Sequence, residues 1–216
     1  MIAVKALWRS ISNNYREGGA RQIVAKTGWR MQQWFRSETV WLIYRVSVEG
    51  YRHTPVLELD RRELGFDALR ELGYFKALDW PEYIQGRLDS GAVCHGFFLD
   101  RRLVNIAWTT AGYLELEAGA TVGDSRSVGV FDCYTLPAFR SRGIYTEALV
   151  MLVHAFRQRG VDGLLIGVDP GNLPSIKGIE RAGFEPLYRL SRLRRLGRDS
   201  FARQAFEPGY RARRNA

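Results

Sequence analysis

A basic loop that contains a glycine is the stretch of this sequence with the clearest chemical potential. Residues 131–146 are typical of a strand, a proline-marked turn, the loop and the start of a helix. The first turn of a helix leaves backbone N–H groups without partners, and its dipole favours anions there. Gly143 has no side chain, so the backbone can approach a phosphate group closely. The predicted anion-binding residues are Arg140, Ser141, Arg142, Gly143, Ile144, Tyr145 and Thr146.

The residues that follow this loop strengthen the interpretation. A helix comes next, then an apolar strand ending at Val168, the segment Asp-Pro-Gly-Asn at 169–172, and a second short helix. The run from 130 to 184 resembles the GCN5-related N-acetyltransferase (GNAT) superfamily. The pyrophosphate pattern of that superfamily, Arg/Gln-x-x-Gly-x-Gly/Ala, is matched by Arg140 and Gly143, although Tyr145 stands at its last position. Its other marks are matched by Asn172, Ser175, Gly183 and Phe184.

The resemblance implies an α/β (α+β) fold with a mixed, mostly antiparallel central sheet. This sheet splays between its fourth and fifth strands and is flanked by helices. The resemblance also implies that acetyl-CoA is the acyl donor and that its pantetheine arm lies along the splayed strand near Cys133 and Thr135, in the manner of an added strand. Asn172 is expected to face the thioester end of acetyl-CoA or the pantetheine amides, and Ser175 is a further predicted cofactor-binding residue. Asn172 can equally cap the helix that follows it.

The implied reaction is direct attack of a neutral amine on the thioester, which needs a base and an acid. The sequence departs from the superfamily here, because Gly129 and Phe131 occupy the usual base positions and Ile179 the usual acid position. Ile179 is expected to pack in the core. Asp132 is the nearest carboxylate and the predicted catalytic residue, although strand alternation turns it from the face shared by Phe131 and Cys133 unless a bulge intervenes.

Other side chains near this point remain open as acids or bases. Those weighed are Glu115, Glu117, Tyr134, Tyr145 and Tyr188. Cys133 is interpreted as a buried strand cysteine, because no histidine lies within ten residues of it to lower the pKa of its thiol. No Cys/His cluster has the spacing of a metal site, so no metal is expected.

The elements that must position these residues follow from hydrophobic patterning. Strands are predicted from residue 40 to about 48, at 92–99 and 103–110 as a hairpin, and at 127–136, 161–168 and 187–196. Helices are predicted at 64–78, 81–88, 144–159 and 175–182. Before residue 40, apolar and basic residues alternate at helical spacing, which predicts a basic helical extension.

Length and charge limit the class of protein. The 216 residues are 46% hydrophobic and 25% charged, which excludes a disordered polyelectrolyte. The net charge is +9, yet residues 41–184 sum to −2, so the excess of positive charge lies at the two ends. Two cysteines exclude a disulfide framework. No signal peptide or spanning helix is expected, which favours the cytoplasm, with peripheral contact at the inner face of the membrane left open.

The predicted domains are a basic helical extension at 1–39, a GNAT-like acyltransferase domain at 40–200 and a basic tail at 201–216. The predicted function is acetyl-CoA-dependent N-acetylation of a primary amine on an anionic or membrane-linked amino sugar or small molecule. Acetylation of aminoacyl-tRNA or a ribosomal protein, and a non-catalytic CoA-binding module, are the alternatives. Expected partners are acyl-CoA and an amine acceptor. An anionic membrane, a second copy of the chain and, less favoured, nucleic acid also stay open.

Overall fold

The computed structural model describes residues 36–72, 81–116 and 119–206. The predicted helices before residue 36 and the last ten residues of the predicted tail lie outside these ranges, and the predicted domain boundaries remain predictions. The chain divides into two compact units, residues 1–40 with 190–203 and residues 41–189 with 204–216. The residues of the predicted anion-binding loop belong to the second unit.

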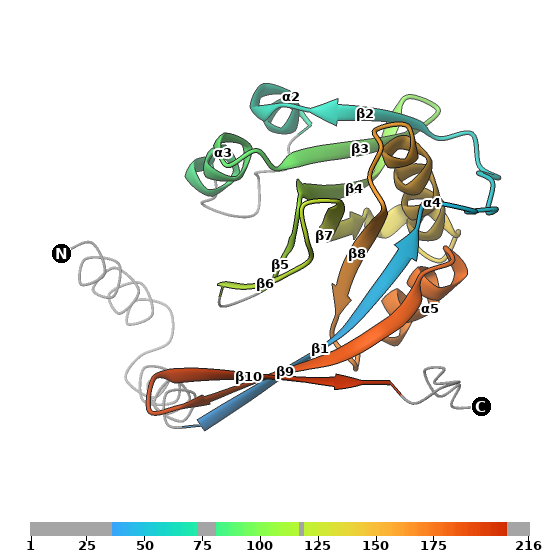
Figure 1. The fold of residues 1–216 in the computed structure, drawn as a ribbon. Coiled ribbons are helices and arrows are strands. Elements are labelled where there is room, and N and C mark those ends of the chain that lie inside the picture. The colour runs from blue at the N-terminus through green and yellow to red at the C-terminus, as the bar shows by residue number, and fades with distance from the viewer. Residues whose placement is uncertain (1–35, 73–80, 117–118, 207–216) are drawn as a thin grey trace. The chain divides into compact units, whose positions relative to one another are not determined.

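The main sheet has eight strands in the order β10-β9-β1-β8-β7-β4-β3-β2 (Figure 1). Its strands are β1 (Arg36–Ser47), β2 (Asp60–Leu64), β3 (Val93–Leu99), β4 (Arg102–Ala111), β7 (Ser127–Thr135), β8 (Gly163–Val168), β9 (Glu185–Arg195) and β10 (Arg198–Ala205). Strands β5 (Leu114–Leu116) and β6 (Ala120–Val122) pair separately as a two-stranded sheet. The helices are α2 (Phe66–Glu71), α3 (Pro81–Asp89), α4 (Ile144–Arg157) and α5 (Leu173–Arg181), with a short 3₁₀ helix η2 (Pro137–Phe139).

The pairing of strands confirms the predicted mixed, mostly antiparallel sheet. Strand β1 runs antiparallel to β8, and the successive pairs from β2 through β4 to β7 are antiparallel as well. Only β7 and β8 are parallel among these pairs. The β3–β4 hairpin turns at Asp100 and Arg101, whose φ angles of 48° and 63° fit a tight two-residue turn.

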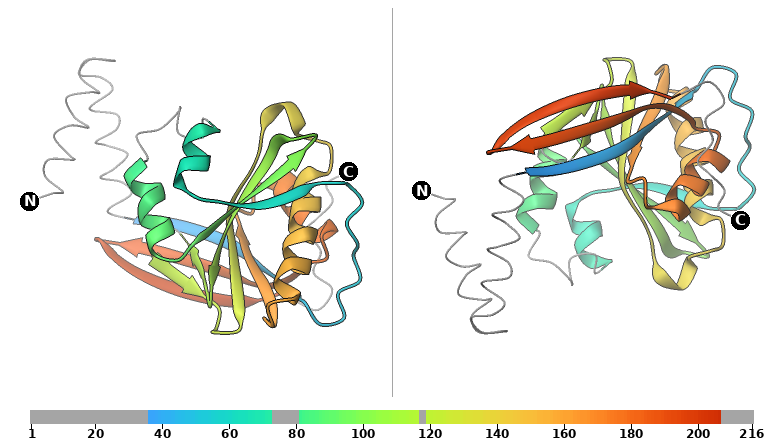
Figure 2. Two further views of the ribbon diagram at one scale, coloured as in Figure 1. Left: turned by 90° about the horizontal axis from the view of Figure 1, so that it is seen from above. Right: turned by 90° about the horizontal axis from the view of Figure 1, so that it is seen from below.

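Helices cover both faces of the sheet within the second unit, as the views in Figure 2 show. One face packs on α4 and α5 through a core that includes Val130, Leu149 and Ile179. The other face packs on α2 and α3 through a smaller core that includes Ile84 and Trp108. The first is called the α4 face below, and the second the α3 face.

Several elements differ from the prediction. Leu64 pairs with Cys94 in the short strand β2, so the helix predicted from residue 64 begins at Phe66 instead. Strand β1 begins at Arg36, four residues earlier than predicted. Strands β2, β5, β6 and β10 were not predicted; β5 and β6 are three residues each, too short for an alternating pattern to emerge.

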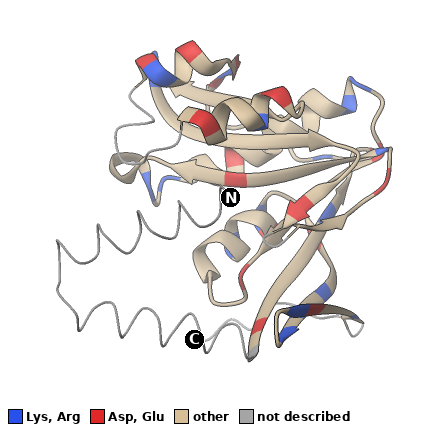
Figure 3. Cartoon of the chain, turned by 90° about the vertical axis from the view of Figure 1, so that its left-hand side faces the viewer, with Lys and Arg blue, Asp and Glu red and all other residues tan. Residues whose placement is uncertain are grey.

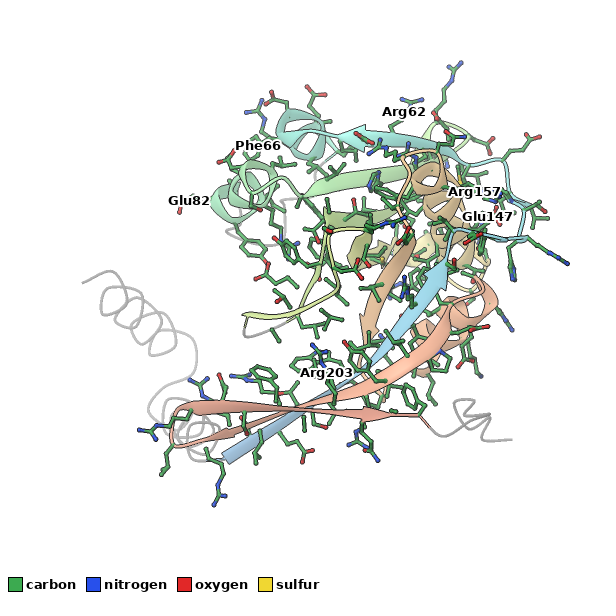
Figure 4. All side chains as sticks on the ribbon, viewed as in Figure 1. Arg62, Phe66, Glu82, Glu147, Arg157 and Arg203 are labelled. Atoms are coloured by element: carbon green, nitrogen blue, oxygen red, sulfur yellow. The ribbon has the colours of Figure 1, made fainter. Side chains whose placement is uncertain are left out.

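Helix α4 is fixed to the segment before β2 by a buried carboxylate. Glu147 lies in the first turn of α4, is 5% exposed, and accepts a hydrogen bond from the backbone N–H of Val56 at 2.7 Å (Figure 4). Tyr51 in the same segment donates to the carbonyl of Ala182 at 2.6 Å. None of the described helices combines the length and apolar character needed to cross a membrane.

Candidate active site

Strands β7 and β8 part after four residue pairs, as the resemblance implied. They are paired in parallel from Ser127 with Gly163 to Val130 with Ile166, and no further β7–β8 pair follows. Strand β7 nevertheless continues to Thr135, held on its other side by β4. The β8-facing backbone edge of residues 131–135 is therefore free of a strand partner. An extended chain can add to such an edge through backbone hydrogen bonds.

A β-bulge lies where the two strands part. The register of β4 against β7 shifts between Ile106, which faces Tyr134, and Trp108, which faces Phe131. Ala107 therefore opposes two residues, Asp132 and Cys133, and the alternation of side chains inverts across them. Asp132 adopts a left-handed backbone with φ 44°, a conformation that costs a non-glycine residue about 1–3 kcal/mol.

The bulge corrects the expected orientation of two side chains. Phe131 packs with the core of the α3 face, whereas Cys133 packs with the core of the α4 face, so they do not share a face. Burial raises the pKa of the Cys133 thiol, and the nearby Asp132 carboxylate raises it further. A thiol with a raised pKa is a poor nucleophile, which supports the interpretation of Cys133 as a structural residue.

Asp132 is directed to the α3 face by an ion pair. Its Oδ2 atom lies 2.5 Å from Nη2 of Arg87 in α3, and 51% of its side chain is exposed. The guanidinium of Arg87 stacks on the rings of Tyr83, Trp108 and Phe131 at 4.3, 5.4 and 5.1 Å from their centroids. Sequence reasoning missed Arg87. The i, i+4 spacing of Tyr83 and Arg87 on a predicted helix was the available signal.

The predicted anion-binding loop begins directly after β7. The side chain of Arg140 donates through Nε to the carbonyl of Thr135 at 3.1 Å, and Arg140 stacks on Tyr134. Arg142 stacks on Phe139. Arg140, Ser141 and Arg142 are exposed, and Ser141 has a left-handed φ of 60°.

Gly143 forms the N-terminal cap of α4 and leaves the helix end open. Its φ is 77°, no side chain caps the helix, and a Cβ built on Gly143 would meet nothing within 4 Å. The first intrahelical bond after it runs from the N–H of Glu147 to the carbonyl of Gly143. The N–H groups of residues 144–146 precede that bond, so the geometry matches an anion-binding helix end.

Three of the predicted site side chains, Tyr145, Thr146 and Ser175, hold α4 to α5, and a fourth, Asn172, caps α5. Ser175 Oγ donates to the hydroxyl of Tyr145 at 3.1 Å, and Thr146 donates to the carbonyl of Gly178 at 3.3 Å. Asn172 caps α5 by accepting from the N–H of Ser175 at 3.2 Å, which confirms the capping interpretation. Burial raises the pKa of Tyr145, so its phenol is a weak acid at neutral pH. These side chains position the open end of α4, whereas the backbone N–H groups of residues 144–146 remain the predicted contacts.

Packing explains why Gly129 and Ile179 stand where the superfamily usually has a catalytic base and acid. A Cβ on Gly129 would lie 2.5 Å from Cα of Leu114 in β5, so this position cannot carry a glutamate without moving that strand. Ile179 is fully buried in the core of the α4 face, as predicted. Glu115 lies in β5, and Glu117 is outside the described residues. Asp132 is thus the carboxylate that the structure brings to the point where β7 and β8 part.

Comparison with solved structures gives the same fold. A GNAT-family acetyltransferase from Colwellia psychrerythraea aligns with a TM-score of 0.55 at 14% identity, over 72% of this chain and 56% of that one. A putative acetyltransferase of the GNAT family from Novosphingobium aromaticivorans aligns with a TM-score of 0.51 at 16% identity, over 72% and 63%. A conserved protein of unknown function from Staphylococcus epidermidis aligns with a TM-score of 0.52 at 11% identity, over 76% and 64%. This chain thus spans less than two thirds of the length of each.

Comparison of the sequence with family models identifies the family. The search of curated proteins found no match. The model of the Acetyltransferase (GNAT) family matches residues 69–184, from α2 to the residue before β9, which is more than half of the chain. The matched range contains the parted strands, the bulge and the open end of α4. The chain therefore belongs to the GNAT family of N-acetyltransferases, in which acetyl-CoA is the acyl donor.

Proposed function

We propose that this chain transfers the acetyl group of acetyl-CoA to a primary amine by direct attack. The observation that carries the proposal is the open N-terminus of α4 at Gly143, next to the unpaired edge of β7. The helix end suits a pyrophosphate, and the strand edge suits the amides of a pantetheine arm. Together they support a donor site whose two halves match the two halves of CoA.

The chain's residues divide the work of the reaction. Acetyl-CoA supplies a thioester carbon that forms a bond to the amine nitrogen while its C–S bond breaks. Asp132 holds the arriving ammonium group, and the ammonium proton passes to this carboxylate or to water before attack. The nitrogen that has attacked releases a second proton to water as the amide forms, and the leaving thiolate takes one proton from water, so the products are an amide, CoA thiol and one proton. Alignment of the two substrates supplies most of the acceleration.

The distribution of positive charge along the chain supports a proposal about the class of the acceptor. The excess positive charge lies in residues 1–40 and 185–216, and Figure 3 marks the described part of it. Such ends favour an acceptor with an anionic part, such as an amino sugar linked to phosphate or to a membrane carrier. Peripheral contact with an anionic membrane at the cytoplasmic side belongs to the same proposal. An RNA-borne amine would exploit the same charge and is distinguished by salt dependence of binding.

Calorimetric titration with acetyl-CoA, followed by thiol release with a panel of primary amines, tests the proposal. The panel contains glucosamine 6-phosphate, glucosamine, benzylamine and spermidine. We expect binding of acetyl-CoA and turnover that is highest for the phosphorylated amine. Binding without turnover across the panel would favour a CoA-binding module, and absence of binding would overturn the proposed donor site.

A further inference from the structure

We propose that Arg87 is a positioning residue for the acceptor: it holds Asp132 on the α3 face so that this carboxylate receives an amine in its ammonium form. This inference rests on the proposed function and extends it, because it names the charge state of the acceptor and the face from which it arrives. The Arg87 cluster is defined here as Tyr83, Arg87, Trp108, Phe131 and Asp132.

The Arg87 cluster fixes the Asp132 carboxylate on one side and leaves it open on the other. Only 17% of the Arg87 side chain is exposed, against 51% of Asp132. Arg87 is engaged by three aromatic rings and by the hydroxyl of Tyr83, so its guanidinium has little freedom to move. A planar guanidinium on aromatic faces is a rigid support that a lysine could not reproduce. The remaining surface of Asp132 is accessible to an incoming cation.

The Arg87 cluster contains a strained backbone at Asp132 and an unsatisfied hydrogen-bond donor at Trp108, and both indicate a functional role for the cluster. Asp132 keeps a left-handed backbone in a strand, and such conformations cluster at functional sites. Trp108 is fully buried, and its indole N–H has no hydrogen-bond partner. Asp132 lies two residues beyond Val130, which forms the last β7–β8 pair with Ile166, and Trp108 pairs across the sheet with Phe131, the residue between them. The proposed donor arm would end at this point.

The charge of the α3 face favours a cation. Helices α2 and α3 together carry four acids and two arginines, and Figure 3 shows the acids spread along both helices. The acids are Asp67, Glu71, Glu82 and Asp89, and Figure 4 shows Glu82 on α3. The field of this pair of helices attracts an ammonium group. Arg87 and Asp132 offset each other in their ion pair, so the two helices together with Asp132 carry five acids against two arginines, a net charge of −3.

Two CoA thioethers measure the charge preference without requiring turnover. S-(2-aminoethyl)-CoA places an ammonium group two carbons from the sulfur, and S-propyl-CoA is its neutral counterpart. Calorimetry gives the dissociation constant of S-propyl-CoA divided by that of S-(2-aminoethyl)-CoA, called the ratio below. It is measured for the wild-type chain, Arg87→Met, Arg87→Lys, Asp132→Asn and the double variant Arg87→Met with Asp132→Asn. Arg70→Met is the matched control, because Arg70 forms an exposed ion pair with Asp67 on α2.

The wild-type chain is expected to bind the ammonium probe about tenfold more tightly than S-propyl-CoA, as for a hydrogen bond to a charged group. Asp132→Asn should bring the ratio to about one, and the double variant should equal it, since Arg87 acts through Asp132. Arg87→Met should lower the ratio at least about threefold. The ratio of Arg87→Lys should lie between those of Arg87→Met and the wild-type chain, and the ratio of Arg70→Met should equal that of the wild-type chain.

The possible failures are distinguishable. A ratio that stays the same or rises in Arg87→Met, with S-propyl-CoA still bound, would overturn the inference and leave the donor site intact. A ratio of one in the wild-type chain would overturn it as well. Loss of both probes from the wild-type chain would instead refute the proposed function, on which the inference rests. Melting temperatures of all variants separate a loss of folding from a loss of preference.

Discussion

The ring of Tyr145 occupies the space that a side chain on Gly178 would need. A Cβ built on Gly178 in α5 would lie 2.5 Å from Cδ1 and 2.9 Å from Cε1 of Tyr145 in α4. The first turn of α4 and the middle of α5 are therefore complementary in shape, because the large ring of Tyr145 packs against Gly178, which has no side chain. The superfamily pattern places a small residue where this chain has Tyr145, and the absence of a side chain at Gly178 leaves room for the Tyr145 ring.

Gly178→Ala is expected to lower the free energy of unfolding by about 1–3 kcal/mol, because the added methyl group forces the Tyr145 ring to shift. The same shift should weaken acetyl-CoA binding, since it moves the open end of α4. Urea unfolding and calorimetry measure the two effects. Combining Gly178→Ala with Tyr145→Ala should show non-additive stability changes, and additive changes would contradict the match between the two residues.

Gly143→Glu should abolish acetyl-CoA binding while leaving the chain folded, because it sets a carboxylate at the proposed pyrophosphate site. We expect the dissociation constant to rise about a hundredfold or more, equivalent to about 3 kcal/mol. Gly160→Glu is the matched control: its φ is 72°, against 77° for Gly143, and a Cβ there also meets nothing within 4 Å. Equal affinities of the two variants in calorimetry would count against the placement of the pyrophosphate.

Ile179→Ala should lower the free energy of unfolding by about 2–5 kcal/mol, because Ile179 is fully buried between α5 and the sheet. Leu173→Ala on the same helix is the control, since that side chain is 44% exposed and should change stability little. Chemical denaturation of the two variants and the wild-type chain provides the comparison. A free energy of unfolding of Ile179→Ala equal to that of the wild-type chain would refute the core role.

Stability is expected to fall as the pH drops from about 6.5 to 4, because of His95. Burial, with Arg61 beside the ring, lowers the pKa of His95 from its ordinary 6.5 to about 4. Its Nδ1 lies 2.8 Å from Nη1 of Arg61 and its Nε2 lies 2.9 Å from Oγ1 of Thr109, so the neutral ring accepts from arginine and donates to threonine.

Between these pH values the unfolded chain binds a proton at His95 that the folded chain does not bind, so protonation favours unfolding. The contribution of this group is at most about 3 kcal/mol. Urea unfolding from pH 4.5 to 7 should show a flatter profile for His95→Gln than for the wild-type chain. The exposed His53 supplies the control His53→Gln, and an unchanged slope in His95→Gln would contradict the assignment.

The proposed donor half of the site could be predicted from the sequence because its signal is local. An anion site at a helix start needs only a strand, a loop with Gly143 and a helix in succession, and all three lie within 131–146. The apolar run ending at Val168 likewise predicts a strand that is buried on both faces. The cap at Asn172 and the burial of Ile179 depend on neighbours within a few residues, and both were predicted correctly.

The position of Asp132, in the proposed acceptor half of the site, was decided by contacts that no local pattern contains. Strand alternation turns Asp132 one way, and the bulge opposite Ala107 turns it the other. Its partner Arg87 comes from a helix 45 positions earlier in the chain. Strand β5 packs against Gly129 in β7 and Gly167 in β8. Neither residue has a side chain, so both leave room for β5.

The sequence by itself determined the family and the order of the core elements and predicted the anion-binding loop, because hydrophobic periodicity and helix-end chemistry act over a few residues. Only the tertiary structure decided which carboxylate stands where β7 and β8 part, and which cation holds it there. A one-residue change of register inverts every side chain beyond it, and register is set by packing against distant strands rather than by the residues of the strand itself.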